Sequence, residues 1–199
     1  MTSKLRLLLT TAMAAAAALG LTAGAAHAEA RVHDGFYLRL GVGGGYAAAT
    51  LFSSAPDSSS HGGNIASELA AGFALRPGMI VGLGTFPMIV QKPSYDGVSA
   101  GGQHVSGTGP FIDYYFDATR GLHVQGAITV SAGYLDGSDQ HPDKVGVGYG
   151  AMGGVGYEFF VSNEWSLGGL FRLTACRLYG VADSIRLASS SVLVAATFN

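Results

Sequence analysis

Residues 122–134 read LHVQGAITVSAGY and alternate between apolar and polar side chains. One row holds Leu122, Val124, Gly126, Ile128, Val130, Ala132 and Tyr134, and the polar residues between them are His123, Gln125, Thr129 and Ser131. Successive side chains of a β-strand point to opposite faces, so the pattern predicts a strand with one apolar and one polar face. The stretch is also long enough to cross a bilayer, which takes a tilted strand about 9–11 residues. We expect lipid on the apolar side and a polar lumen on the other.

Residues 145–160 repeat this alternation with glycine on the second face. The apolar row is Val145, Val147, Tyr149, Ala151, Val155, Tyr157 and Phe159, and the other row is Gly146, Gly148, Gly150, Gly154, Gly156 and Glu158. The interior of an eight-stranded barrel is only just wide enough for side chains to fill it. We therefore expect the glycine row to face a narrow lumen.

Similar segments bring the number of predicted strands to eight: 36–48, 64–75, 79–90, 105–116, 122–135, 145–160, 165–178 and 188–198. Short connections at 76–78, 117–121 and 161–164 alternate with long ones at 49–63, 91–104, 136–144 and 179–187. Short periplasmic turns and longer outer loops are typical of outer-membrane barrels. The sequence thus predicts an all-β fold, an eight-stranded antiparallel up-and-down transmembrane β-barrel.

The composition favours a chain that is covered by lipid. Charged residues make up 12% of the chain, whereas soluble domains contain about one quarter. After Leu21 no apolar run approaches the roughly 18 residues of a transmembrane helix. A closed barrel is the other structure that satisfies every backbone hydrogen bond inside a bilayer. The formal net charge of −2 argues against nucleic acid as a partner.

The first 28 residues predict a cleaved signal peptide. Lys4 and Arg6 precede an apolar core over 7–21, and Ala26-His27-Ala28 matches the small-x-small cleavage pattern. Residues 1–28 are therefore assigned to the signal peptide and 29–199 to one barrel domain. An uncleaved membrane anchor is disfavoured because the apolar run is short for a spanning helix.

Aromatic residues gather near the predicted strand ends, as in interfacial girdles. Those expected at periplasmic ends are Phe36, Tyr37, Phe116, Phe159, Phe160, Trp165 and Phe198, and those at outer ends are Tyr46, Phe52, Tyr95, Tyr134 and Tyr179. Cys176 is the only cysteine. It falls in a predicted strand, where we expect it to pack as a small side chain.

Three features together resemble the small outer-membrane β-barrel proteins, the group of the OmpA transmembrane domain and OmpX. They are the signal peptide, the turn at 162–167 (SNEWSL) into an aromatic-led strand, and the closing strand at 192–198 (VLVAATF). The family usually ends on the aromatic residue, whereas Asn199 follows Phe198 here. The resemblance implies the outer membrane of a Gram-negative bacterium, surrounded by lipid and lipopolysaccharide, and insertion by the barrel-assembly machinery. It implies neither an activity nor a cofactor.

Five charged residues are predicted on the inner face: Arg39, Glu68, Asp113, Glu158 and Arg172. An unpaired charge in a narrow lumen is costly, so opposite charges are expected to pair. Such a set could form a polar pathway for small solutes, or a salt-bridged plug that fills the barrel. The small interior of an eight-stranded barrel favours the plug.

Two further patterns suggest chemistry more weakly. His61, His104 and His141 fall in different outer connections, together with Asp57, Asp96, Asp136, Asp139 and Asp143. These side chains can bind cations, but no two histidines form a short motif, so no metal site is predicted. His104 and Ser106 share a strand face and faintly resemble the His-x-Ser pair of the lipid A deacylase barrels, although Gly107 stands where that family has Asn. Ser138-Asp139-Gln140-His141 offers a second Ser, Asp and His.

These patterns lead to three functional hypotheses. The favoured one is a non-enzymatic barrel with a structural or surface-interaction role that presents the four long loops outside the cell. The alternatives are a narrow porin-like channel and a lipid A acyl-modifying enzyme. A soluble periplasmic barrel would need an apolar lumen, and the alternation predicts a polar one.

Overall fold

The computed structural model describes residues 31–52, 58–91, 93–95, 98–99, 102–135, 144–180 and 184–199. The expected signal peptide at 1–28 lies outside the described residues. Within these ranges, no helix is both long and apolar enough to cross a membrane.

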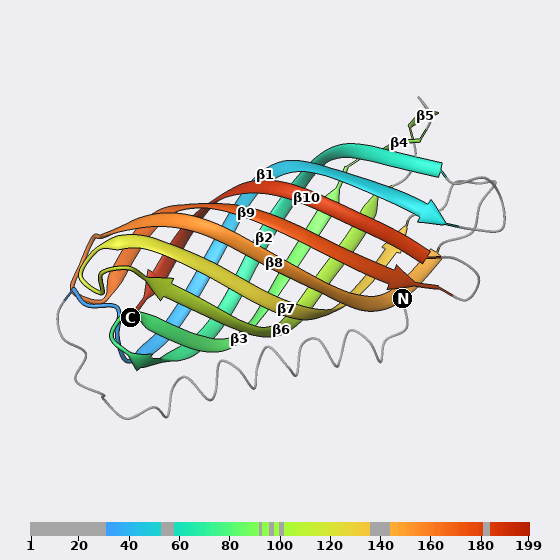
Figure 1. Cartoon of the computed structure of the whole chain (residues 1–199). Coiled ribbons are helices and arrows are strands. Elements are labelled where there is room, and N and C mark those ends of the chain that lie inside the picture. Colours follow the sequence, from blue (N-terminus) through green and yellow to red (C-terminus); the bar gives the residue numbers. More distant parts are fainter. Residues whose placement is uncertain are drawn as a thin grey trace, which may run out of the picture.

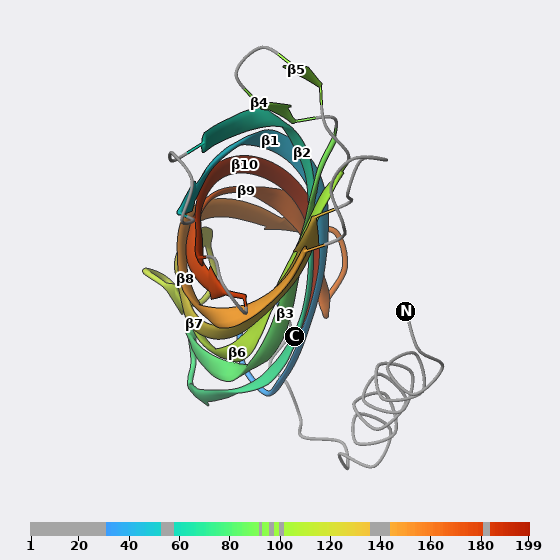
Figure 2. The ribbon, with the colours of Figure 1, turned by 90° about the vertical axis from the view of Figure 1, so that its right-hand side faces the viewer.

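Eight long antiparallel strands form a closed barrel (Figures 1 and 2). They are β1 (Phe36–Phe52), β2 (Ser58–Arg76), β3 (Met79–Val90), β6 (Gln103–Tyr115), β7 (Gly121–Leu135), β8 (Lys144–Phe160), β9 (Trp165–Tyr179) and β10 (Ser184–Phe198). Each long strand pairs with the next, and β1 pairs with both β2 and β10, which closes the sheet. The predicted fold class is confirmed.

The strands are staggered around the barrel. A path through paired residues runs from Leu40 on β1 through Leu69, Thr85, Thr108, Val130, Tyr149, Arg177 and Arg186, and returns to β1 at Thr50. The path thus returns ten residues beyond its start (50 − 40 = 10). A closed barrel requires such a stagger, which tilts the strands relative to the barrel axis.

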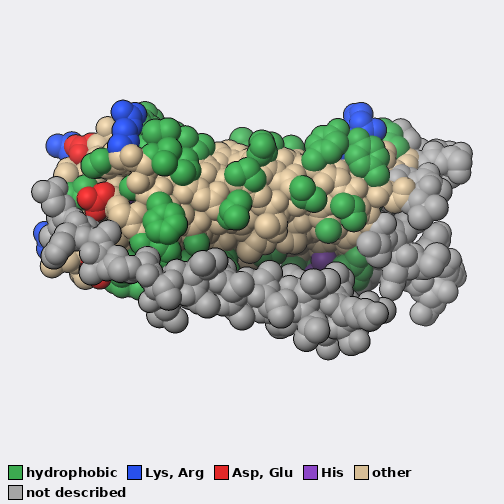
Figure 3. Space-filling view, turned by 90° about the horizontal axis from the view of Figure 1, so that it is seen from below, with side chains coloured by type: hydrophobic (Ala, Val, Ile, Leu, Met, Phe, Trp, Pro, Cys, Tyr) green, Lys and Arg blue, Asp and Glu red, His purple; other side chains and the backbone are tan. Residues whose placement is uncertain are grey.

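The predicted alternation between the two faces of the wall is confirmed. On β7, Val130 is 68% exposed, whereas the adjacent Ser131 is 2% exposed. Figure 3 shows hydrophobic side chains scattered along the wall and charged side chains gathered toward its two ends. An apolar band between charged ends is the surface that a membrane barrel presents to a bilayer.

The lumen is less polar than expected, because two apolar clusters fill much of it. One contains Phe86, Phe111 and Met152, and the other contains Leu178 and Leu187. Cys176 also packs in the second cluster, as expected. Protein interiors are close-packed, and apolar side chains fill the space without leaving buried polar groups unpaired.

Most strands extend further at their outer ends than predicted. β1 reaches Phe52 and β2 begins at Ser58, so much of the expected loop 49–63 is paired strand. Two short strands that were not predicted, β4 (Ser94–Tyr95) and β5 (Val98–Ser99), extend the sheet beside β2. Backbone groups still need hydrogen bonds beyond the apolar band, so pairing continues where the alternating apolar pattern has ended.

Candidate functional site

All five predicted lumen charges point into the barrel and are buried. Arg39 and Asp113 are 0% exposed, Glu158 and Arg172 are 2% exposed, and Glu68 is 4% exposed. They come from five strands, β1, β2, β6, β8 and β9. The closed sheet brings them into two separate groups, one around Arg39 and one around Arg172.

The first group centres on Arg39, which lies between two carboxylates. Its Nη1 lies 2.7 Å from Asp113 Oδ2, and its Nη2 pairs with Glu158 Oε1. Nη2 also donates to the hydroxyl of Tyr115 at 2.9 Å, and Nε donates to the hydroxyl of Thr197 at 3.1 Å. The guanidinium therefore links β1 to β6 and β8 across the lumen, and to the neighbouring strand β10.

Hydroxyl groups also donate to these carboxylates, although Asp113 Oδ1 has no hydrogen-bond partner. Ser166 donates to Glu158 Oε2 at 2.6 Å, and Thr197 donates to Glu158 Oε1 at 2.9 Å. Tyr37 donates to Asp113 Oδ2 at 2.8 Å. Buried charges are tolerated where partners satisfy them in this way.

The second group surrounds Arg172. Its Nη1 lies 3.4 Å from Glu68 Oε2, and the amide of Gln125 donates to the other carboxylate oxygen of Glu68 at 2.7 Å. The guanidinium carbon of Arg172 also lies 5.8 Å from the ring centroid of Phe86. This group ties β9 to β2 and β7 and adjoins the first apolar cluster.

Little open space lies beside the second group. An internal cavity lined by Phe86, Met152, Arg172 and Cys176, among others, measures about 20 Å³. A cavity must reach roughly 10–15 Å³ to hold a single water molecule. This part of the lumen is therefore a packed interior.

The segment before β1 packs against the short turns at one end of the barrel. The backbone N–H of His33 donates to Ala118 O, and the N–H of Gly78 donates to His33 O, both at 2.8 Å. The His33 ring stacks on Tyr115 at 3.6 Å, and its Nδ1 donates to Asn199 Oδ1 at 3.0 Å. Burial lowers the pKa of His33 from its ordinary value of 6.5, although the Asn199 hydrogen bond and Glu158 act in the opposite direction.

Sequence reasoning missed several members of this interior. Tyr37 was expected in the periplasmic aromatic girdle, which was wrong: it is 0% exposed and points into the lumen. Its position two residues before Arg39, which was predicted on the inner face, was the available signal. Strand parity could also have identified Tyr115 as an inward residue. The role of His33 could not have been found this way because it precedes the first strand.

The other sequence candidates do not assemble into a site in the described part of the chain. His104 stacks on Tyr134 at 4.7 Å, and the Ser106 hydroxyl lies 3.4 Å from that of Thr85. The ring of His61 lies 6.1 Å from that of Tyr46. His141, Ser138 and the loop aspartates (Asp57, Asp96, Asp136, Asp139 and Asp143) lie outside the described residues. Among those that are described, no three His, Cys, Asp or Glu side chains are grouped as metal ligands would be.

Comparison with known proteins finds similarity in fold. No protein-family model and no curated protein sequence matches the chain. Among solved structures, Neisserial surface protein A is 17% identical over 80% of this chain and 95% of its own, with a TM-score of 0.51. OprG of Pseudomonas aeruginosa is 9% identical over 85% and 98%, with a TM-score of 0.46. The outer-membrane protease OmpT of Escherichia coli is 9% identical over 83% and 97%, with a TM-score of 0.45. The likeness to Neisserial surface protein A, together with the closed eight-stranded sheet, shows the fold of the small outer-membrane β-barrels.

Proposed function

We propose that this protein is a non-enzymatic β-barrel of a Gram-negative outer membrane, a closed scaffold that presents its outer connections at the cell surface. On this account residues 1–28 direct export and are removed, and the barrel-assembly machinery inserts residues 29–199. The observation that carries the proposal is the combination of an apolar outer wall with a lumen that is crossed by buried ion pairs.

The lumen contacts favour a plug over a channel. Arg39 contacts five other strand residues at once, and each of those contacts crosses the lumen or joins strands around it. A conducting pathway would have to separate these pairs, and breaking one buried pair costs about 3–5 kcal/mol. The five lumen charges are therefore proposed as structural residues that hold the barrel closed.

The contacts of His104 and Ser106 on the outer wall do not favour the hypothesis of a lipid A acyl-modifying enzyme. His104 and Ser106 each contact a neighbour on another strand, Tyr134 and Thr85 respectively. Nucleophilic catalysis needs the base within hydrogen-bond reach of the hydroxyl. The contacts of this pair are those of residues that pack on a barrel wall.

Conductance in planar lipid bilayers tests the plug. We expect the refolded full chain to insert without producing a stable single-channel current. The conductance of Glu68→Gln, which removes the carboxylate beside Arg172, is recorded under the same conditions and compared with that of wild type. A reproducible unit conductance that shifts in Glu68→Gln would show that ions pass this group and would replace the plug with the channel.

A further inference from the structure

Two arginines lie side by side on the outer wall. Arg177 on β9 and Arg186 on β10 are register partners, each two residues from the outer end of its strand. Arg177 is half-buried and Arg186 is exposed. The guanidinium carbon of Arg177 lies 5.2 Å from the ring centroid of Tyr179, and that of Arg186 lies 4.9 Å from that of Phe52. Aromatic rings thus hold both cations near the outer rim of the barrel.

This arginine pair has no protein counter-charge among the described residues. The ion pairs found there are those of Arg39, Arg120 and Arg172. The Nε of Arg177 is buried and has no hydrogen-bond partner. Like charges directly opposite each other destabilise a sheet. The arrangement is therefore complementary to an anion.

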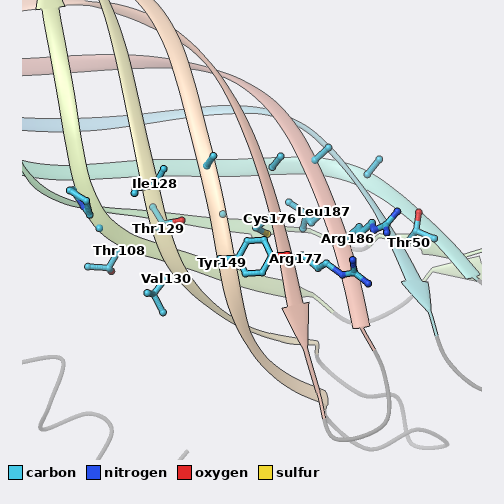
Figure 4. A pocket seen from close by; sticks show the side chains of 17 residues that line it. Thr50, Thr108, Ile128, Thr129, Val130, Tyr149, Cys176, Arg177, Arg186 and Leu187 are labelled. Atoms are coloured by element: carbon cyan, nitrogen blue, oxygen red, sulfur yellow. The ribbon is translucent and has the colours of Figure 1, made fainter.

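A groove of about 930 Å³ adjoins the pair on the outer wall (Figure 4). Its floor includes a row of paired, exposed alanines on four neighbouring strands: Ala48, Ala188, Ala175 and Ala151. Figure 4 shows Tyr149 between the arginines and the apolar side chains of Ile128 and Val130. The groove thus has one cationic end and an apolar body.

We propose that this groove binds lipopolysaccharide, with a lipid A phosphate on Arg177 and Arg186 and an acyl chain along the alanine row. The inference rests on the proposed outer-membrane location. Planar guanidinium groups bind phosphate through paired, charge-assisted hydrogen bonds. Near the outer strand ends the arginines lie where outer-leaflet headgroups lie, and the short alanine side chains leave room for a chain beside them.

A second copy of this chain fits the groove less well. In a two-fold symmetric contact the same patch meets itself, which would bring four unneutralised arginines together. Phosphorylated lipid supplies the missing negative charge and the apolar chain in one molecule.

Binding of fluorescent lipopolysaccharide to the refolded full chain in detergent micelles tests the proposal. Arg177→Gln with Arg186→Gln should weaken binding by about tenfold or more, because charge-assisted hydrogen bonds to phosphate are lost. Arg76→Gln with Arg120→Gln removes the same charge near the opposite end of the barrel and should leave the affinity unchanged. Ala151→Leu with Ala175→Leu fills the groove without changing charge and should also weaken binding.

Two competitors distinguish binding of a lipid A phosphate from binding of free phosphate. Lipid A without its phosphates should compete poorly with labelled lipopolysaccharide, and inorganic phosphate at millimolar concentration should not displace it. Equal affinity in wild type and the Arg177/Arg186 variant would overturn the proposal, as would complete displacement by inorganic phosphate. If all variants still resist SDS until heated, such a failure concerns this groove alone, and the proposed membrane barrel stands.

Discussion

Arg39 is the centre of the charge group in the half of the lumen nearest the short turns. It forms ion pairs with both Asp113 and Glu158, and all three side chains are fully or almost fully buried. Replacing it removes one positive charge and leaves two buried carboxylates without their cation. An unpaired buried charge is far more costly than a missing pair.

We predict that Arg39→Met lowers the free energy of unfolding by about 3–5 kcal/mol. Urea titration of the refolded barrel, followed by the folded band on a cold gel, would measure this loss. Arg120→Met, in the exposed pair with Asp117, is the control and should change little. The combination of Arg39→Met with Asp113→Asn and Glu158→Gln should recover part of the loss. Equal stability of Arg39→Met and wild type would contradict a structural role for the network.

His33 predicts a pH dependence. Its pKa is lower in the folded protein than the ordinary value of 6.5, chiefly because of burial. Below about pH 6.5 the unfolded chain therefore binds a proton that the folded protein takes up only at lower pH, so stability falls as pH falls through this window. Glu158, His123 and Arg39 are the charged or titratable groups that act on this ring.

The expected result is a larger loss of stability between pH 8 and pH 5 in wild type than in His33→Gln. The measurement is urea unfolding at both pH values, compared as a difference between the two proteins so that other titrating groups cancel. If both proteins lose the same stability, His33 does not titrate as its burial requires.

Prediction of single residues from the sequence worked where the alternation of side chains along a strand decides which face a residue occupies. It placed Arg39, Glu68 and Arg172 on the inner face because side chains alternate across a strand. It could not say that Arg39 reaches both Asp113 and Glu158, because cross-lumen partners depend on the stagger of strands that are distant in sequence. Tyr37 was misassigned because an aromatic residue near a strand end fits a girdle and a lumen equally well.

At the scale of single strands, the glycines on the inner face of β8 leave room for side chains that pack in the lumen. A methyl group added at Gly156 would lie 2.4 Å from Nε2 of His123. That ring cannot move freely, because its Nδ1 lies 2.9 Å from Gly121 O and its Nε2 lies 3.3 Å from Nη2 of Arg39. A methyl group at Gly153, on the outer face of the same strand, would meet nothing closer than 3.8 Å.

Gly156→Ala should therefore destabilise the barrel by about 1–3 kcal/mol through overpacking, whereas Gly153→Ala should be nearly neutral. The same urea titration compares them. A loss in Gly153→Ala that matches that in Gly156→Ala would mean that backbone propensity, and not lumen packing, explains the glycines.

Strand identity was readable from the sequence, but the outer strand ends were not. Within the bilayer one face must be apolar, so β7 and β8 carry a strong alternating pattern. Residues 58–63 (SSSHGG) carry no alternating apolar pattern and still pair with β1. The β4–β5 hairpin went unpredicted for the same reason.

At the scale of the whole molecule, closure explains how fold and interior are related. Pairing of β1 with β10 removes the sheet edges and brings strands distant in sequence around one narrow lumen. Closure also generates the outer surface, where the register aligns Ala48, Ala188, Ala175 and Ala151 beside Arg177 and Arg186. The fold class was predictable from local alternation, whereas the ion pairs and the groove depend on register, which glycine-rich strands specify weakly.

Heat-modifiability of the membrane-extracted protein tests the central claim most directly, because folded outer-membrane barrels resist SDS until they are heated. Membranes of a Gram-negative host that expresses the full chain would be extracted with detergent and compared on a gel with and without boiling. We predict that the protein fractionates with the outer membrane and migrates differently after boiling. Recovery in the soluble periplasmic fraction, with no shift on boiling, would contradict a membrane-embedded barrel.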